Sequence, residues 1–378
     1  MKRSPLGKLK TIFSTAYLNY LGFKSNRKFC VIESDDWGSV RMPNLITYET
    51  LLENRIRVDK CPYNRLDNLE STEDILRLRD TLNKLEKKIR KRVVITANVV
   101  MSNPDFLKIE ESTFQKFSEL NLRQSHDYYN GNTEGLEMFK QVVEEGYLYP
   151  QLHGLNHVNQ NNWLSDLKCK VQDTTIAFNN NVYGLSTNIA AKPRKTYLAA
   201  LDFVEEDELQ RHRSWMKDGA ELFKEEFGFT SRSFIAPNYT WHQAHESMML
   251  ANGIRYIQGA RAQKVPLGDN YRVDRHCMGE QNKYGQFYLV RNSAFEPSVK
   301  GQVNWKKKIL SDAYIAFAFG APLVISSHRL NFMGGIQRQN RERNLQNFSA
   351  ILTGLIERYP DIEFVSSEKL GDYISSQA

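Results

Sequence analysis

Residues 28–38, KFCVIESDDWG, are the stretch of sequence that decides the fold. A short apolar run, 29–32, breaks off into a polar segment that contains the adjacent carboxylates Asp35 and Asp36. Apolar runs of this length with polar flanks are typical of buried strands. A charge removed from water is costly unless it is paired or binds a metal ion, so two carboxylates at the end of such a strand indicate a site. Taken alone, the pair also fits an ordinary acidic turn.

Polar residues also follow later apolar strands. The strands expected at 147–152, 233–236 and 322–327 run directly into His153, Pro237 and His328. Helical patterns separate the strands, and one helix is expected to begin at Ser71, which forms a capping-box pattern with Asp74. This alternation predicts an α/β fold with a parallel sheet. About seven or eight apolar strands favour a closed barrel over an open sheet, with the chemistry at the carboxyl ends of the strands.

The composition is that of a soluble globular protein. The 378 residues are 41% hydrophobic and 25% charged, and no apolar stretch approaches the roughly 18 residues of a membrane helix. The net charge of +7 is spread over basic residues that alternate with acids, which gives no support for a nucleic-acid partner. The four cysteines have no paired spacing, which fits reduced thiols and argues against a structural zinc site. We therefore expect a cytoplasmic protein.

The chain is interpreted as one domain with an extension and an insertion. Residues 1–27 are a basic, mildly apolar N-terminal extension that makes a poor signal peptide. We expect it to pack on the domain as a helix, with weak contact to an anionic membrane surface as the alternative. Residues 28–378 form a single barrel-like domain. Its Asn-rich stretch at about 158–200 is too long for a simple loop and predicts an insertion over the binding face.

His153 and His157 predict a metal site. Two imidazoles four residues apart lie on one face of a helical turn, where they can share one ion. With Asp36 they supply two nitrogens and one oxygen, a ligand set that catalytic zinc uses while its fourth position stays open. Without the carboxylate, the same spacing fits two unrelated surface histidines.

Asp35 and His328 are the candidate general base and general acid. Adjacent residues at a strand end point apart, which leaves Asp35 free of the metal and able to accept a proton. His328 is the natural proton donor to a leaving group, although a histidine hydrogen-bonded at a strand end is an equal alternative. With a metal ion that polarises a carbonyl and activates water, this set of groups hydrolyses an amide or an ester.

These motifs resemble those of the polysaccharide deacetylases, metal-dependent carbohydrate esterases that remove N-acetyl or O-acetyl groups from glycans. The resemblance is carried, in chain order, by Ser34-Asp35-Asp36-Trp37, His153-Gly-Leu-Asn-His157, residues 205–237 and Ile325-Ser-Ser-His328. It implies that Asp35 is the catalytic base, that Asp36, His153 and His157 hold one divalent ion, and that His328 is the catalytic acid. It also implies a distorted (β/α) barrel of about seven strands, zinc as the ion, and an acetylated glycan substrate, with N-acetyl favoured over O-acetyl.

The sequence departs from the family pattern near its third motif. Ile235 stands where the family usually has an arginine that steadies the catalytic aspartate. Arg232, Arg291 and Arg329 are the candidates to replace it from elsewhere in the chain. Asn238, which follows the motif's proline, is expected to give its backbone N–H to the oxyanion.

Two further assignments stay open. For the family's fourth motif the sequence offers only Asp274 and Arg275, which also fit a surface loop. Aromatic residues near the strand ends can stack on sugar rings, with packing in the core as the alternative. These aromatic residues are Trp37, Tyr239, Trp241 and Trp163.

Two rival functions are compatible with the same residues. One is the hydrolysis of a non-sugar amide by the same fold. The other is a catalytically impaired barrel that binds glycans, for which the best support is Ile235 in place of the arginine.

Overall fold

The structure, a computed structural model, describes residue 17 and residues 19–378. Its centre is a nine-stranded sheet in which eight strands follow the order β10-β7-β6-β5-β2-β1-β12-β11. The ninth strand, β13, pairs with Phe29 and Cys30 at the start of β1. All pairings of this sheet within the described residues are parallel, which confirms the predicted α/β class. The strands are β1 (Phe29–Trp37), β2 (Ile95–Val99), β5 (Leu148–Leu152), β6 (Ser233–Ile235), β7 (Tyr256–Gly259), β10 (Phe287–Val290), β11 (Ser293–Ala294), β12 (Leu323–His328) and β13 (Glu363–Phe364).

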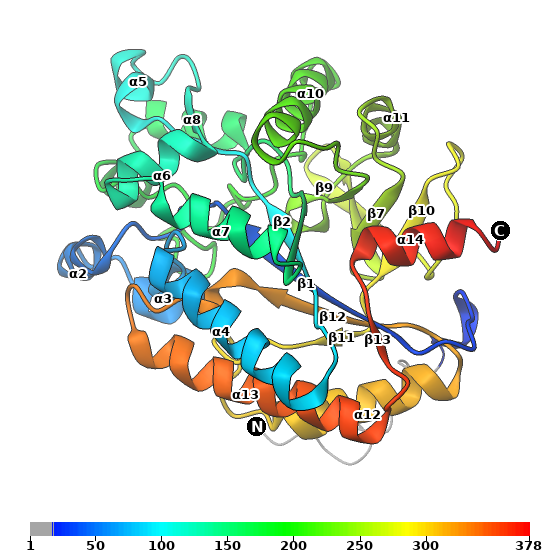
Figure 1. The fold of residues 1–378 in the computed structure, drawn as a ribbon. Helices are drawn as coiled ribbons and strands as arrows, with labels where there is room; N and C mark the ends of the chain where they lie inside the picture. The colour runs from blue at the N-terminus through cyan, green and yellow to red at the C-terminus, as the bar shows by residue number, and fades with distance from the viewer. Residues whose placement is uncertain (1–16, 18) are drawn as a thin grey trace.

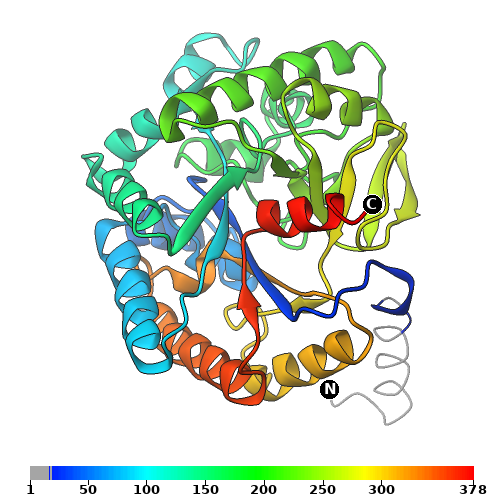
Figure 2. The same ribbon diagram turned by 45° about the vertical axis from the view of Figure 1, so that its right-hand side comes forward.

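Helices surround the sheet on its outer side, as the two ribbon views show (Figures 1 and 2). They are α2 (Leu45–Glu53), α3 (Pro62–Leu66), α4 (Thr72–Ile89), α5 (Phe106–Glu111), α6 (Leu122–Asn130), α7 (Glu134–Glu144), α8 (Gln160–Lys168), α9 (Gln172–Phe178), α10 (Glu208–Phe227), α11 (Gln243–Ala251), α12 (Trp305–Ala318), α13 (Arg338–Arg358) and α14 (Ser367–Ser375). Two small two-stranded antiparallel sheets, β3 (Ser102–Pro104) with β4 (Glu119–Asn121) and β8 (Ala262–Leu267) with β9 (Asn270–Arg275), lie outside the central sheet. None of the described helices is both long enough and apolar enough to cross a bilayer.

The prediction of a closed barrel is not confirmed, because the sheet is open between β10 and β11. These edge strands are separated by only two residues, Arg291 and Asn292. The Arg291 amide donates to Gly259 on β7, whereas the Asn292 amide donates to Val324 on β12. The chain therefore leaves one edge of the sheet and joins the other within two residues, without a strand ladder across the gap.

Strand β1 is buried on both faces, which explains its continuous apolar run. Cys30 and Ile32 belong to the large core cluster that includes residues of the outer helices. Phe29 and Val31 belong to a second cluster, to which α14 contributes Leu370 and Ile374. The two faces of β1 are therefore covered by different parts of the core.

The predicted insertion at 158–200 contains α8 and α9, so it is less irregular than its composition suggests. Trp163, Phe178 and Tyr197 of this stretch belong to a separate hydrophobic cluster that also contains Phe106 of α5. Residues from 186–198 line the cavity at the strand ends. Most of the predicted extension at 1–27, with its helix and membrane contact, lies outside the described residues.

The helix expected to begin at Ser71 does so, with Ser71 as its N-cap. The Ser71 side chain accepts from the Asp74 amide, and the Asp74 carboxylate accepts in turn from the Ser71 amide. This capping box starts α4, which packs against α13 and α7.

Candidate metal and catalytic site

The end of β1 is bent, which places both aspartates in one cavity. The pairing of β1 with β2 shifts register between Ser34 and Trp37, and Asp36 has a left-handed backbone with φ of 70°. Non-glycine residues adopt this conformation at a cost and mostly at turns and functional sites. The expectation that the two side chains diverge is therefore only half correct: both line the same cavity, but each contacts different partners.

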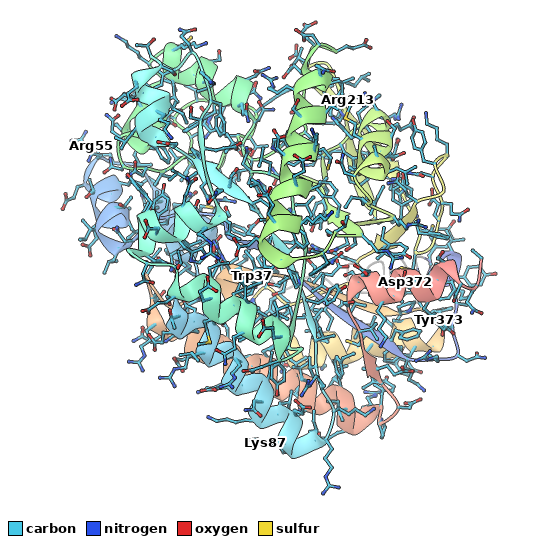
Figure 3. All side chains as sticks on the ribbon, turned by 45° about the horizontal axis from the view of Figure 1, so that its top comes forward. Trp37, Arg55, Lys87, Arg213, Asp372 and Tyr373 are labelled. Atoms are coloured by element: carbon cyan, nitrogen blue, oxygen red, sulfur yellow. The ribbon has the colours of Figure 1, made fainter. Side chains whose placement is uncertain are left out.

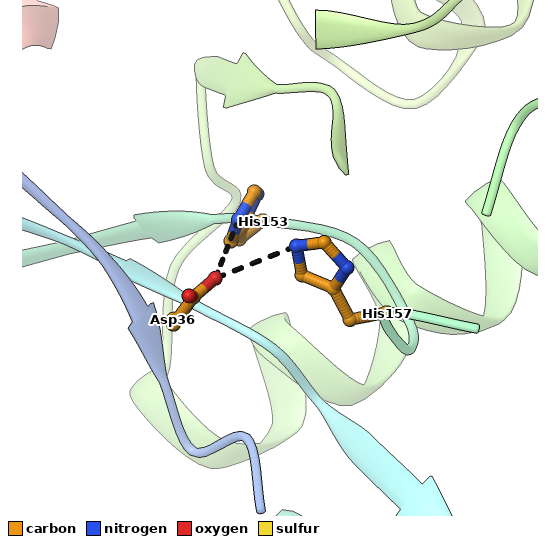
Figure 4. Close-up of side chains that lie close together, drawn as sticks. All are labelled: Asp36, His153 and His157. Carbon is orange, nitrogen blue, oxygen red and sulfur yellow. Dashed lines mark ion pairs between the residues drawn. The ribbon is translucent and has the colours of Figure 1, made fainter. Parts of the chain in front are cut away.

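Asp36, His153 and His157 form a buried cluster of candidate metal ligands (Figure 4). The Asp36 Oδ1 atom lies 3.3 Å from His153 Nε2 and 3.4 Å from His157 Nε2. Two ligand atoms each about 2.1 Å from a zinc ion at a tetrahedral angle are about 3.4 Å apart. The separations therefore suit ligands of one ion better than they suit a hydrogen bond, whose donor and acceptor are usually closer.

The hydrogen bonding of His153 supports the same conclusion. Its Nδ1 lies 2.8 Å from the Ile235 carbonyl oxygen. Since a carbonyl only accepts, Nδ1 is the donor of this hydrogen bond, and Nε2 is the ring nitrogen that faces Asp36. A backbone carbonyl that fixes the tautomer is also a common partner of metal-binding histidine.

His157 completes the ligand set. Burial lowers the pKa of His157 to about 3, so its imidazole stays neutral and can coordinate an ion. Its Nδ1 is buried with no hydrogen-bond partner among the described residues. The three residues thus fit a divalent cation, with two imidazoles and one carboxylate, all nearly inaccessible to solvent.

The two histidines do not lie on a helical turn, which corrects the sequence prediction. Strand β5 ends at Leu152, and 153–157 is a loop in which Gly154 has φ of 104°. A Cβ at Gly154 would lie 2.1 Å from Trp215 Cη2 on α10. The glycine is therefore required both by its backbone conformation and by the close packing of the tryptophan, and together they set the direction of the two imidazoles.

Arg291 makes the contact with Asp35 that was expected of an arginine at position 235, where this chain has isoleucine. Its Nη1 and Nη2 donate to Asp35 Oδ2 and Oδ1, both at 2.7 Å, and its Nε donates to Glu33 at 2.5 Å. Burial alone would raise the pKa of Asp35, but the Arg291 guanidinium lowers it to about 2. Arg232 instead pairs with Asp372 and Arg329 with Asp67, so neither of these two fills the role.

A buried polar layer supports this pair. Asn98 on β2 donates to Asp35 Oδ1 at 2.8 Å, and Gln258 on β7 is hydrogen-bonded to Asn98. Ser367, at the start of α14, donates to Glu33 at 2.7 Å. Fully hydrogen-bonded networks of this kind restrict side-chain rotation, so the Asp35 carboxylate is held in one orientation.

His328 lies beside Asp35 because of strand register. The parallel pairing of β1 with β12 places these two residues opposite each other, with His328 Nε2 3.9 Å from Asp35 Oδ2. His328 Nδ1 donates to Glu296 at 2.7 Å. Burial alone would lower the pKa of His328, but the Glu296 carboxylate raises it to about 10. His328 is therefore a protonated imidazolium at neutral pH.

The cavity above these residues has a volume of about 900 Å³. Its lining includes Asn238 and Tyr239, whose left-handed backbones (φ of 55° for both) follow β6. The Tyr239 hydroxyl accepts from Arg291 Nη1 at 3.0 Å. Tyr63 also lines the cavity and packs edge-on against His328, with ring centroids 5.2 Å apart.

The three tryptophans that the sequence suggested for sugar stacking are core residues. Trp37 is fully buried, donates its indole N–H to Ser34 and packs against Phe139 (Figure 3). Trp241 and Trp163 are equally buried, and none of the three lines the cavity. Of the predicted aromatic residues, only Tyr239 lines it.

The suggested fourth motif does not reach the site. Asp274 and Arg275 lie on the β8–β9 hairpin, where Asp274 pairs with Arg272 instead. Sequence reasoning missed Glu296 and Tyr63, which contact His328, and the cavity residue Arg41. Glu296 follows β11, a strand of two residues that is too short to show a sequence pattern, so no signal in the sequence pointed to it.

Comparison with known proteins gives likeness at the level of structure only. No protein-family model and no curated protein matches the sequence. Solved structures do match, among them a Mycobacterium smegmatis protein assigned as a polysaccharide deacetylase (11% identity, TM-score 0.40, covering 94% of this chain and 93% of that chain). PuuE allantoinase (9%, TM-score 0.48, 95% and 93%) and a family 4 acetyl xylan esterase from Clostridium thermocellum in complex with a cobalt ion (11%, TM-score 0.33, 92% and 91%) also match.

Proposed function

We propose that this protein is a metal-dependent hydrolase that removes acetyl groups, N-acetyl in preference to O-acetyl, from a polysaccharide or oligosaccharide. The observation that carries the proposal is the convergence, in one cavity, of a three-residue ligand cluster, an ionised Asp35 and a protonated His328. Asp36, His153 and His157 would hold one divalent ion, for which zinc suits this ligand set. When bound, such an ion polarises the acetyl carbonyl and lowers the pKa of a water molecule.

Asp35 is the proposed general base. Because its pKa lies near 2, the side chain remains a carboxylate at neutral pH and can accept the proton of the attacking water. The same low pKa makes it a weak base, so its contribution depends on position. Arg291 and Asn98 fix that position through hydrogen bonds to both carboxylate oxygens.

His328 is the proposed general acid. With Nδ1 bonded to Glu296, its Nε2–H points to the Asp35 side of the cavity and can protonate the departing amine or alkoxide. General acid–base groups of this kind typically contribute about a hundredfold to ten-thousandfold in rate. The backbone N–H of Asn238 is proposed to bind the oxyanion, and Tyr239 to contact the sugar, since both line the cavity.

The rival function, a catalytically impaired barrel that binds glycans, loses its main support. That rival was based on Ile235, but the guanidinium missing at this position is supplied by Arg291, and Ile235 instead orients His153 through its carbonyl. A cytoplasmic location stays a proposal, supported by four cysteines that are all free thiols.

The proposal is tested by acetate release from N-acetylated oligosaccharides, with and without a chelator, beside a panel of simple acyl amides. We expect release from the oligosaccharides that stops with the chelator and returns with added zinc. Asp35→Asn should keep its zinc and lose turnover. Hydrolysis of the acyl amides alone would favour the non-sugar rival, and normal turnover by Asp35→Asn would refute the assigned base.

A further inference from the structure

Arg41 is a buried cation in the proposed catalytic cavity, and no carboxylate of the described residues forms an ion pair with it. The residue is 4% exposed and lines the cavity together with Asp36 and His328. Its Nε has no hydrogen-bond partner within the described part of the chain, and no carboxylate of that part lies within 4.0 Å of its guanidinium nitrogens. Arginine is rarely buried without a counter-charge, because the desolvated guanidinium is costly unless it is paired.

Neither of the two carboxylates that act electrostatically on Arg41 forms an ion pair with it. Asp36 faces the two histidines. Asp67 accepts from Arg329 at 2.9 Å through Oδ1, and its Oδ2 has no hydrogen-bond partner among the described residues. The place of Arg41 is also closely fitted: a Cβ at Gly184 would lie 2.9 Å from its Nε. The side chain is thus held in the wall of the cavity, and within residues 19–378 no carboxylate is bound to it.

The rest of the cavity wall is also positive. Its lining contains four arginine and lysine side chains, Arg41, Arg194, Lys195 and Lys264, beside the His328 imidazolium, against only two carboxylates, Asp35 and Asp36. Arg291 already neutralises Asp35, and a divalent ion would more than neutralise Asp36. Arg194 lies over the ring of Tyr197 and donates to two backbone carbonyls, so no carboxylate of the described residues neutralises it. Lys195 does have a carboxylate partner, Asp202, at 3.8 Å.

Arg41 lies on the leaving-group side of the site. Its Cζ is 5.4 Å from the ring centroid of Tyr63, and the Tyr63 hydroxyl is 3.4 Å from His328 Nδ1. Under the proposed function, His328 protonates the atom that stays on the sugar. A group bound by Arg41 therefore belongs to the sugar part of the substrate and not to the acetyl group.

We infer that the substrate is an acetylated sugar that carries an oxyanion, a carboxylate or a phosphate, and that Arg41 binds this group. A guanidinium matches either anion because its planar N–H groups donate to two oxygens at once. The inference rests on the proposed function for the reaction, but anion binding by Arg41 can be measured without it.

The experiment compares three N-acetylated substrates with the full-length, zinc-supplemented protein. They are a neutral N-acetylglucosamine oligosaccharide, an oligosaccharide that alternates N-acetylglucosamine with glucuronate, and N-acetylglucosamine 1-phosphate. We expect at least tenfold higher kcat/KM for one anionic substrate than for the neutral one, and which one it is identifies the anion. In Arg41→Gln this ratio should fall at least tenfold, mainly through KM, while Arg41→Lys should keep part of it.

A matched control is Arg213→Gln, which removes one exposed positive charge from α10 (Figure 3) and should leave the ratio unchanged. Gly184→Ala keeps the charge of Arg41 but displaces it, so it should lower the ratio as well. The melting temperatures of all variants, measured in parallel, separate loss of binding from loss of folding. Equal kcat/KM on all three substrates, or an unchanged ratio in folded Arg41→Gln, would overturn the inference.

Binding of inorganic phosphate and of free glucuronate, measured by calorimetry, separates this inference from the proposed function. Binding that is lost in Arg41→Gln, with no acetate released from any substrate, supports the anion site and counts against the deacetylase. Acetate release without any Arg41-dependent binding or preference supports the deacetylase and rejects the anion site.

Discussion

Arg291 clamps Asp35 through two parallel hydrogen bonds of 2.7 Å, although the two residues are far apart in the sequence. The contact lowers the pKa of the proposed base, which keeps it ionised, and fixes its orientation. It thereby supplies the guanidinium that isoleucine at position 235 does not provide. Arg291 occupies the point where the chain passes from β10 to β11, so the opening of the sheet and the support of Asp35 have the same structural origin.

Replacing Arg291 should impair both catalysis and stability. Arg291→Met would leave Glu33 buried without its counter-charge and Asp35 with only the more distant His328 imidazolium. Removal of one partner from such a buried ion pair typically costs about 3–5 kcal/mol of unfolding free energy. Arg291→Lys keeps the charge but loses the paired hydrogen bonds, so we expect kcat to fall by about a hundredfold with a smaller change in KM. Urea unfolding and acetate-release kinetics measure the two effects. Arg232→Lys is the control, and wild-type behaviour of both Arg291 variants would contradict the assignment.

Asp36→Asn should remove the metal while the neighbouring Asp35→Asn retains it. The first change takes the only carboxylate from the ligand cluster, whereas the second leaves the cluster intact. Elemental analysis after dialysis against zinc should find one ion per chain in wild type and in Asp35→Asn. Zinc at a thousand times its Kd should stabilise these two proteins by about 4 kcal/mol and leave Asp36→Asn unaffected. Equal zinc content in the two variants would disprove the ligand set.

Glu296→Gln should move the alkaline limb of the pH–rate profile to lower pH. His328 acts in its protonated form, so activity is present below its pKa and is lost as the pH rises through about 10. Without the Glu296 carboxylate, burial dominates and the pKa of His328 falls. We expect the upper limb of kcat/KM to shift down by at least one pH unit while the acidic limb stays in place. An unchanged upper limb would mean that His328 is not the acid.

Gly154→Ala should weaken zinc binding and folding together. The new Cβ meets Trp215 at 2.1 Å in a backbone conformation that alanine disfavours. We expect a loss of about 2–5 kcal/mol in unfolding free energy from the combined strain and overpacking. Gly131→Ala is the matched control, because Gly131 is also left-handed but a Cβ there meets nothing within 4 Å. If both variants lose equal stability, the contact with Trp215 is not responsible.

Glu70→Gln should cost stability at neutral pH but little in acid. Glu70 accepts from Arg329 at 2.6 Å and from the Gly38 amide, next to the end of β1. Burial alone would raise the pKa of Glu70, but Arg329 lowers it to about 2. The stability that Glu70 contributes is therefore fully present above its ordinary pKa of about 4.5 and is lost as the pH falls towards 2. We expect a difference of roughly 3 kcal/mol at pH 7 that drops below half by about pH 3.

Denaturant unfolding of the two proteins at several pH values checks this prediction. Glu73→Gln is the control, because the Glu73 side chain is 57% exposed and surface ion pairs contribute little. A difference between wild type and Glu70→Gln that stays constant from pH 7 to pH 3 would contradict it.

Much of the fold follows from local sequence pattern. The run 29–32 predicted β1 because a strand covered on both faces needs continuous apolar residues. The Ser71 capping box predicted the start of α4 because capping acts over three residues. Local pattern also chose Asp36, His153 and His157, although their convergence depends on a left-handed Asp36 and on Gly154 instead of a helical turn.

Other features depend on which strands become neighbours. Arg291 could not be chosen among three arginines, because its distance from Asp35 is set by the gap between β10 and β11. The tryptophans near the strand ends were equally ambiguous, since an aromatic residue at a strand end can face either the cavity or the core.

The sequence by itself therefore determined the parallel α/β class, the order of the polar clusters along the chain and the residue types on which the proposed metal-assisted hydrolysis depends. The tertiary structure decided which arginine holds Asp35, that Glu296 keeps His328 protonated, and that Arg41 faces the cavity unpaired with any carboxylate of the described residues. The reason is physical. Strand and helix formation depends mainly on residues that are neighbours in the sequence. Charge pairing and burial depend instead on distances between residues that only folding brings together.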